Sequence, residues 1–135
     1  MRYLKQSSGG IFLAANSELK LNGFSDSDWV GCPETRKSLT GYIINLGRSP
    51  IAWRSKMQNT VLRSSSEAEY RALASTTCEL QWLLYLLEDL HAEHTQPVLL
   101  FCDNQSASQI ALNPVFHERM KHIEIDYHVV REKVQ

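Results

Sequence analysis

The sequence has few of the features that mark secreted or membrane proteins. Its three cysteines are an odd number without C-x-x-C spacing, so neither a disulfide framework nor a structural zinc site is expected. No apolar run approaches the roughly 18 residues that cross a membrane, and the N-terminus lacks the apolar region of a signal peptide. We therefore expect an intracellular chain, cytoplasmic or nuclear, without membrane association.

Strong charge of either sign is also missing. The 135 residues carry 14 Lys and Arg against 15 Asp and Glu, a net charge of -1. This balance excludes a basic nucleic-acid-binding tail or an acidic tail as the main feature, but it is compatible with a local basic patch. The length corresponds to one domain or a part of one.

Three strands joined by short turns are predicted in the first half of the chain. Residues 19–30 alternate between apolar and polar side chains, and residues 39–46 are rich in β-branched and aromatic types. Residues 51–55 form a third candidate, and Gly47-Arg48-Ser49-Pro50 before it is typical of a hairpin turn. Short turns between consecutive strands predict an antiparallel meander.

A long helix is predicted next, ending near residue 91. Its start has two candidate capping boxes, Ser64 with Glu67 and Ser66 with Glu69. One face of this helix is apolar apart from a threonine and a glutamate, and it comprises Glu69, Leu73, Thr76, Leu80, Leu83 and Leu87. Because a desolvated carboxylate is costly without a partner, Glu69 on this face calls for an explanation.

A buried central strand is predicted at residues 98–102, which are all apolar. Asp103 and Asn104 follow it as a good helix N-cap pair, and residues 105–112 read as a short helix. A last helix is predicted from about residue 118 or 121 to residue 135.

Three acidic residues lie at special places in this order of elements. Asp26 is in the first strand, Glu69 is on the apolar face of the helix, and Asp103 ends the buried strand. Taken singly, each could be a strand-edge or capping residue. Together, three converging carboxylates would repel one another unless divalent cations neutralised them. Oxygen-only ligands favour Mg²⁺ or Mn²⁺ over zinc.

The order of these elements and several local motifs resemble the RNase H domain of copia-type retrotransposon Pol polyproteins. The matching motifs are GFSDSDWVGC (23–32), TRKSLTGY (35–42), PIAWRSK (50–56), RSSSEAEYRA (63–72), DN (103–104) and KHIE (121–124). The resemblance implies an α/β RNase H-like fold over residues 20–135, with three antiparallel strands, then a parallel strand, and flanking helices. Residues 1–19 resemble the end of the preceding reverse-transcriptase region.

The resemblance also implies an activity: two-metal-ion cleavage of the RNA strand of an RNA–DNA hybrid, as part of a reverse transcriptase. By position, Asp26 would bridge both metals, Glu69 would hold the second metal, and Asp103 would help to hold the metal of the attacking water. Asp28 shares a strand face with Asp26, so periodicity does not separate them, and only the family motif favours Asp26. Glu67 lies about 200° round the helix from Glu69 and should point away.

The family's site uses four carboxylates, and the fourth is expected beyond residue 135, after a fifth strand. Glu124 and Asp126 are acids of the last predicted helix, and we interpret them as a solvated face rather than as substitutes. The chain is thus expected to lack the last strand and helix and to hold three of four ligands. Because two-metal chemistry needs a closed ligand cage, the activity of this piece alone is left open.

Two groups of side chains are candidate contacts with the hybrid. Polar residues beside the inferred ligands and basic residues of the strand–turn region make up these groups: Ser27, Ser66, Asn104 and Gln105, then Arg36, Lys37, Arg54, Lys56 and Arg63. Ordinary solvated surface charge is the alternative for the basic group. The expected partners are the hybrid and the remainder of the Pol polyprotein. Two alternatives are an inert truncated remnant that binds nucleic acid weakly at most, and a different nuclease or integrase on the same fold. The motifs around Asp26 and Glu69 argue against the second alternative.

Overall fold

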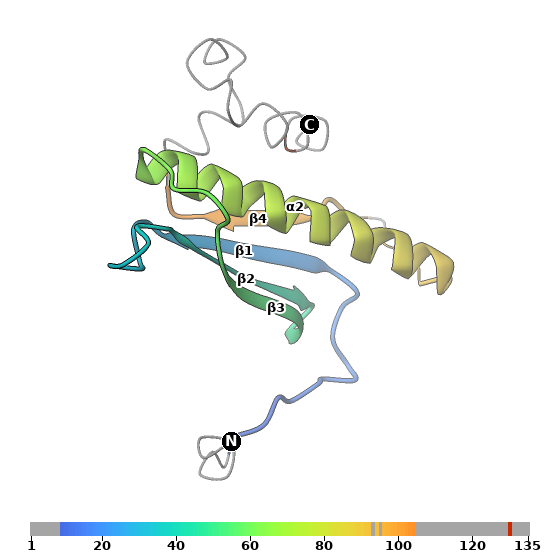
Figure 1. The fold of residues 1–135 in the computed structure, drawn as a ribbon. Coiled ribbons are helices and arrows are strands. Elements are labelled where there is room, and N and C mark those ends of the chain that lie inside the picture. Colours follow the sequence, from blue (N-terminus) through green and yellow to red (C-terminus); the bar gives the residue numbers. More distant parts are fainter. Residues whose placement is uncertain (1–8, 93, 95, 105–129, 131–135) are drawn as a thin grey trace.

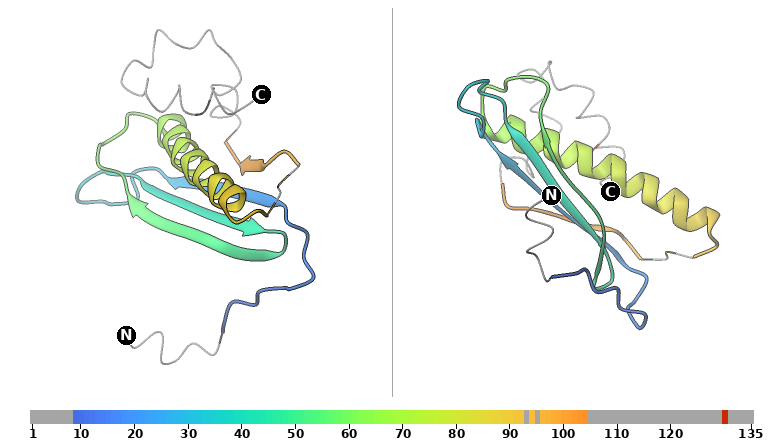
Figure 2. Two further views of the ribbon diagram at one scale, coloured as in Figure 1. Left: turned by 90° about the vertical axis from the view of Figure 1, so that its right-hand side faces the viewer. Right: turned by 60° about the horizontal axis from the view of Figure 1, so that its bottom comes forward.

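The computed structural model describes residues 9–92, 94, 96–104 and 130. The elements are β1 (Leu21–Asp28), β2 (Leu39–Leu46), β3 (Ser49–Met57), α2 (Ser65–Asp89) and β4 (Leu99–Cys102). The four strands form one mixed sheet in the order β3-β2-β1-β4, in which β1, β2 and β3 are antiparallel and β4 is parallel to β1. Helix α2 runs along one face of this sheet (Figures 1 and 2). This is the predicted α/β architecture with an RNase H-like arrangement of elements.

The hairpin between β2 and β3 follows from its turn residues. Leu46 pairs with Ser49, which leaves Gly47 and Arg48 as a two-residue loop. Gly47 has φ +60°, the left-handed conformation that the first central position of a type II′ turn requires. A Cβ atom at Gly47 would also overlap the Ser17 hydroxyl, so a second constraint keeps this position free of a side chain.

The start of α2 is set by the first of the two predicted capping boxes. The Ser64 side chain accepts a hydrogen bond from the Glu67 backbone N–H at 3.2 Å, and Ser64 is the N-cap. The Glu67 carboxylate reaches back to the Arg63 N–H, with an Oε2–N distance of 3.1 Å. Two backbone donors at the helix start are therefore satisfied by side chains three and four residues away, the second of them on the residue before the N-cap rather than on the N-cap itself.

The core lies between α2 and the sheet, on the helix face that the sequence predicts. Leu80 and Leu83 pack with Leu21, Tyr42 and Ile44. In β1, a Cβ atom at position 23 would sit 3.0 Å from the Leu80 side chain and 3.1 Å from the Leu100 side chain, so the glycine there admits the close approach of the helix.

Strand β4 differs from the prediction of a buried central strand. Its side chains at Leu99 and Phe101 are 41% and 47% exposed, and within the described part of the chain β4 pairs with β1 alone and forms the edge of the sheet. Phe101 stacks on Phe24, with ring centroids 5.1 Å apart, on the face opposite α2. The prediction failed because an apolar run of five residues does not reveal whether one face or both are covered.

The predicted helix 105–112 lies outside the described residues, as do Gln105, Glu124 and Asp126. Of the last predicted helix only Val130 is described, and it is helical and buried. No helix in the described ranges has both the length and the hydrophobicity that crossing a membrane requires.

Candidate metal centre

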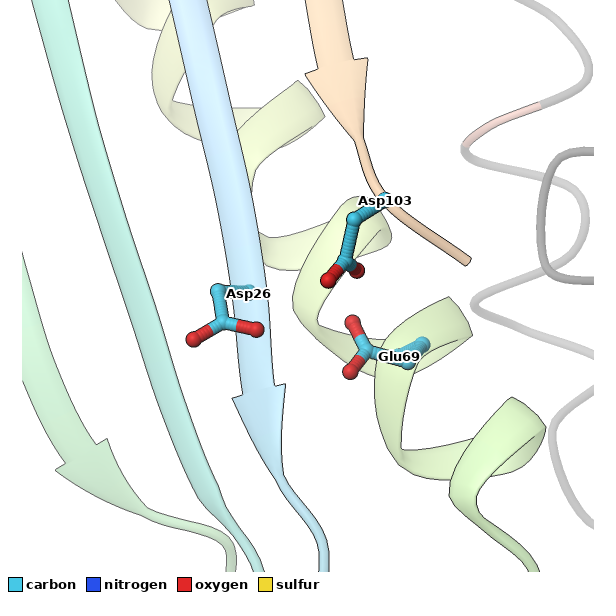
Figure 3. Close-up of side chains that lie close together, drawn as sticks. All are labelled: Asp26, Glu69 and Asp103. Atoms are coloured by element: carbon cyan, nitrogen blue, oxygen red, sulfur yellow. The ribbon is translucent and has the colours of Figure 1, made fainter. Parts of the chain in front are cut away.

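The three acidic residues singled out in the sequence come together in space. One carboxylate oxygen each from Asp26, Glu69 and Asp103 lies within 4.8 Å of the others. Figure 3 shows the three side chains gathered between β1, the first turns of α2 and the end of β4. A cluster of this size matches the oxygen ligand set of divalent cations, including a pair of ions about 3.5–4 Å apart.

Asp26 and Asp103 meet because of the register between two parallel strands. The last paired residues are Ser25 of β1 and Cys102 of β4, so Asp26 and Asp103 are the next residue on each strand. The carboxyl ends of parallel strands lie at the same edge of a sheet, and this edge is a common place for ligand sites. Beyond it, β1 continues with β2 as its partner up to Asp28.

Glu69 completes the cluster from the helix. Its side chain is 6% exposed, whereas Asp26 and Asp103 are exposed. Its Oε1 accepts a hydrogen bond from the Ser27 backbone N–H at 3.2 Å, and the buried Oε2 has no hydrogen-bond partner among the described residues. Burial, followed by the charges of Asp26 and Asp103, raises the pKa of Glu69 to about 7, although the Ser27 N–H opposes this shift.

These residues fit a hard divalent cation. A buried carboxylate oxygen without a hydrogen-bond partner leaves a desolvation cost that a coordinated cation would offset. The same cation would neutralise the repulsion among three carboxylates, which otherwise favours protonated Glu69. The donor set contains oxygen alone, which suits Mg²⁺ or Mn²⁺.

The structure separates the two rival acids from the cluster. Asp28 turns toward the loop after β1, where a Cβ atom at position 31 would sit 2.6 Å from its Oδ2. Glu67 points toward the Arg63 N–H, as its position round the helix predicts. Asp26 rather than Asp28, and Glu69 rather than Glu67, therefore lie in the cluster with Asp103.

The predicted nucleic-acid contacts are distributed unevenly around the cluster. Ser66 and Asn104 are half-buried beside Glu69 and Asp103, whereas the Ser27 side chain is buried and its backbone N–H serves Glu69. The basic residues Arg54, Lys56 and Arg63 are exposed. Arg54 and Lys56 flank Ser55 in β3. Ser55 pairs with Gly41 of β2, which pairs with Asp26 of β1, so the backbones at Ser55 and Asp26 are two strand spacings apart, roughly 10 Å. The structure does not bring Arg54 and Lys56 into the carboxylate cluster.

One buried polar residue near the site has no marker in the sequence. Gln58 follows β3 in a run of polar residues that reads as a surface loop, yet it is buried and bonded to both the sheet and α2. A short polar run after a strand is equally typical of an exposed loop. The burial of Gln58 is therefore seen only in the tertiary structure, where α2 packs on the sheet.

The fold and the cluster together define an RNase H-like α/β region with a candidate divalent-metal centre. The chain is homologous to segments of plant polyproteins named as retrovirus-related Pol polyproteins. It is 48% identical over its whole length to the one from transposon RE1 of Arabidopsis thaliana, 49% identical over 93% of its length to that from transposon RE2 of the same plant, and 38% identical over 99% to that from transposon TNT 1-94 of Nicotiana tabacum.

The chain spans only about a tenth of the length of these relatives, between 9% and 10%. No protein-family model matches it. No solved structure matches it either. The homology supports a role related to retrotransposons.

The raised pKa of Glu69 predicts that Mg²⁺ binding depends on pH. Because the cation must displace the proton, each pH unit below 7 should weaken apparent binding about tenfold. We expect subsaturating Mg²⁺ to raise the melting temperature at pH 8 and to have much less effect at pH 6. Thermal unfolding with MgCl₂, compared with NaCl of equal ionic strength, measures this. An equal Mg²⁺ effect at the two pH values would contradict the role of Glu69.

Proposed function

We propose that this chain is the ribonuclease H region of a retrotransposon Pol polyprotein, which cleaves the RNA strand of an RNA–DNA hybrid with two Mg²⁺ or Mn²⁺ ions. The observation that carries this proposal is the meeting of Asp26, Glu69 and Asp103 within 4.8 Å. The homologues named as Pol polyproteins support the same setting. The remainder of the polyprotein, including the reverse transcriptase, would be the partner.

Asp26, Glu69 and Asp103 would hold the ions. When bound, such ions activate a water for in-line attack on the phosphate and stabilise the leaving 3′ oxygen. The chain's own part is placement: the β1–β4 register sets Asp26 beside Asp103, and the Ser27 N–H orients one oxygen of Glu69. With Oε1 held in this way, the unbonded Oε2 is the atom free to coordinate.

The substrate preference rests on chemistry beside the cluster. RNA is distinguished from DNA by its 2′-hydroxyl groups, which polar side chains can contact across the shallow minor groove. Ser66 and Asn104 are partly exposed next to two of the inferred ligands and would make such contacts, together with Gln105. Arg63, exposed just before α2, would meet a backbone phosphate.

Cleavage of a labelled RNA strand in an RNA–DNA hybrid tests the proposal. The assay should compare this chain with a longer Pol segment that contains it and extends beyond residue 135, because a further ligand is expected there. We expect Mg²⁺-dependent cleavage by the longer segment, none in EDTA, and none of a DNA duplex. A folded longer segment that leaves the hybrid intact would contradict the proposal and favour an inert remnant.

A further inference from the structure

Gln58 joins the sheet to the start of α2 through one amide group. It lies directly after β3 and is 6% exposed. Its Nε2 donates to Thr40 Oγ1 of β2 at 2.9 Å and to the Ala68 carbonyl of α2 at 3.1 Å. Its backbone N–H donates to the Ser38 carbonyl at 2.8 Å, which holds the residue itself in place.

This link acts at the part of α2 that matters for the metal centre. Ala68 directly precedes Glu69, and its side chain is fully buried. The Ser64 cap stabilises the first helical turn from within, but it does not fix where that turn lies over the sheet. The Gln58–Ala68 bond does so from the sheet, because Gln58 lies directly after β3 and is bonded to Thr40 of β2.

The nitrogen of the Gln58 amide suits this position, whereas its buried Oε1 has no hydrogen-bond partner among the described residues. An amide nitrogen carries two N–H donors, and Gln58 uses Nε2 for two acceptors on different elements. An ionised glutamate at position 58 would offer no hydrogen-bond donor. A methionine there would fill a similar volume, also without a hydrogen-bond donor. Because the Glu69 carboxylate moves with the helix backbone, loss of the link would let the first turn shift relative to β1 and β4.

We propose that Gln58 is a positioning residue for the metal centre: it fixes the first turns of α2 on β2, so that Glu69 meets Asp26 and Asp103. This inference rests on the proposed metal-binding function of those carboxylates. It adds a requirement beyond the three ligands themselves: α2 must be bonded to the sheet through Gln58 and Thr40.

The test uses a longer Pol segment that contains this chain and extends beyond residue 135. It compares Gln58→Met with Thr77→Val, which removes a buried Thr77 Oγ1–Leu73 O hydrogen bond of 2.9 Å farther along the same helix. Melting temperature in EDTA reports the structural cost, and electron paramagnetic resonance of free Mn²⁺ reports metal affinity. We expect both variants to melt lower in EDTA. We expect Gln58→Met alone to bind Mn²⁺ about tenfold more weakly, as is typical when groups that orient metal ligands are removed.

Thr40→Val cuts the same link at its other end and keeps the inference testable if Gln58→Met does not fold. Thr40→Val should also weaken Mn²⁺ binding. The control Thr77→Val should bind Mn²⁺ as tightly as the unchanged segment. Unchanged affinity in the folded link variants would overturn the positioning role while leaving the proposed function intact. Failure of the unchanged longer segment to bind Mn²⁺ would instead overturn the metal-binding function and the positioning role with it.

Discussion

We expect the replacement of Asp26 with asparagine to lower the proposed Mg²⁺-dependent hybrid cleavage by more than about 100-fold in a Pol segment that contains this chain. The expected loss exceeds the 10–100-fold typical of removing groups that merely orient metal ligands, because Asp26 would itself be a ligand. It lies with Glu69 and Asp103 within 4.8 Å. Asparagine has nearly the same size and keeps one oxygen but loses the charge, so the effect is electrostatic rather than steric.

Asp28→Asn is the matched control for this substitution. Asp28 is two residues along the same strand and is also exposed, but its carboxylate turns toward the loop at Gly31. We expect its replacement to leave cleavage within about twofold, since exposed substitutions away from a site have small effects. Initial rates on the same labelled hybrid, measured at saturating Mg²⁺, compare the two variants. Equal losses in both, or no loss in Asp26→Asn, would show that the first ligand is assigned to the wrong residue.

We expect Glu69→Gln to have two opposite effects. It should remove the proposed stabilisation by Mg²⁺, yet it should raise the melting temperature of the metal-free protein at pH 8. The pKa of Glu69 is about 7 in the folded chain against an ordinary value of 4.5. Stability from the protonated form is therefore fully present below pH 4.5 and is lost as the pH rises through 7. At pH 8 the buried charge opposes folding, and a neutral glutamine removes it while still accepting the Ser27 N–H.

We expect a gain of about 3–6 °C without metal at pH 8, which corresponds to roughly 1 kcal/mol in a domain of this size. About one pH unit below 4.5 and lower, the gain should vanish, because Glu69 is then protonated in both the folded and the unfolded chain. Glu67→Gln is the control: it lies two residues away, contacts the Arg63 N–H, and should keep the Mg²⁺ effect. A melting temperature that falls in Glu69→Gln at pH 8 would indicate a structural glutamate instead of a destabilising ligand.

Local patterns in the sequence were sufficient for much of the fold. The strand predicted at 39–46 has the same bounds in the structure, and α2 begins after Ser64, one of the two predicted capping residues. Both are local features: a run rich in β-branched and aromatic residues, and a side chain that bonds to a backbone group three residues away. The buried face of α2 follows in the same way from helical spacing.

The exposure of β4 could not be obtained from the same kind of reasoning. The apolar composition of residues 98–102 indicates burial. Whether one or both faces of the strand are buried depends on which elements pack against the sheet on each side. In the structure, Leu100 packs toward α2 whereas Phe101 lies with Phe24 on the other face. The domain boundary near residue 20, the two-ion stoichiometry and the hybrid contacts stay predictions.

The sequence by itself determined which side chains are available for chemistry: three acids on a strand, on the apolar face of a helix and at the end of a strand. Tertiary structure alone decided which acids meet. Asp26 and Asp28 share the period-two pattern of one strand, so only the pairing of Ser25 with Cys102 and the turn at Gly31 separate them. Strand register and helix placement arise from contacts between residues far apart in the chain, such as the Ser27 backbone N–H of β1 with the Glu69 carboxylate of α2. No local pattern encodes those contacts.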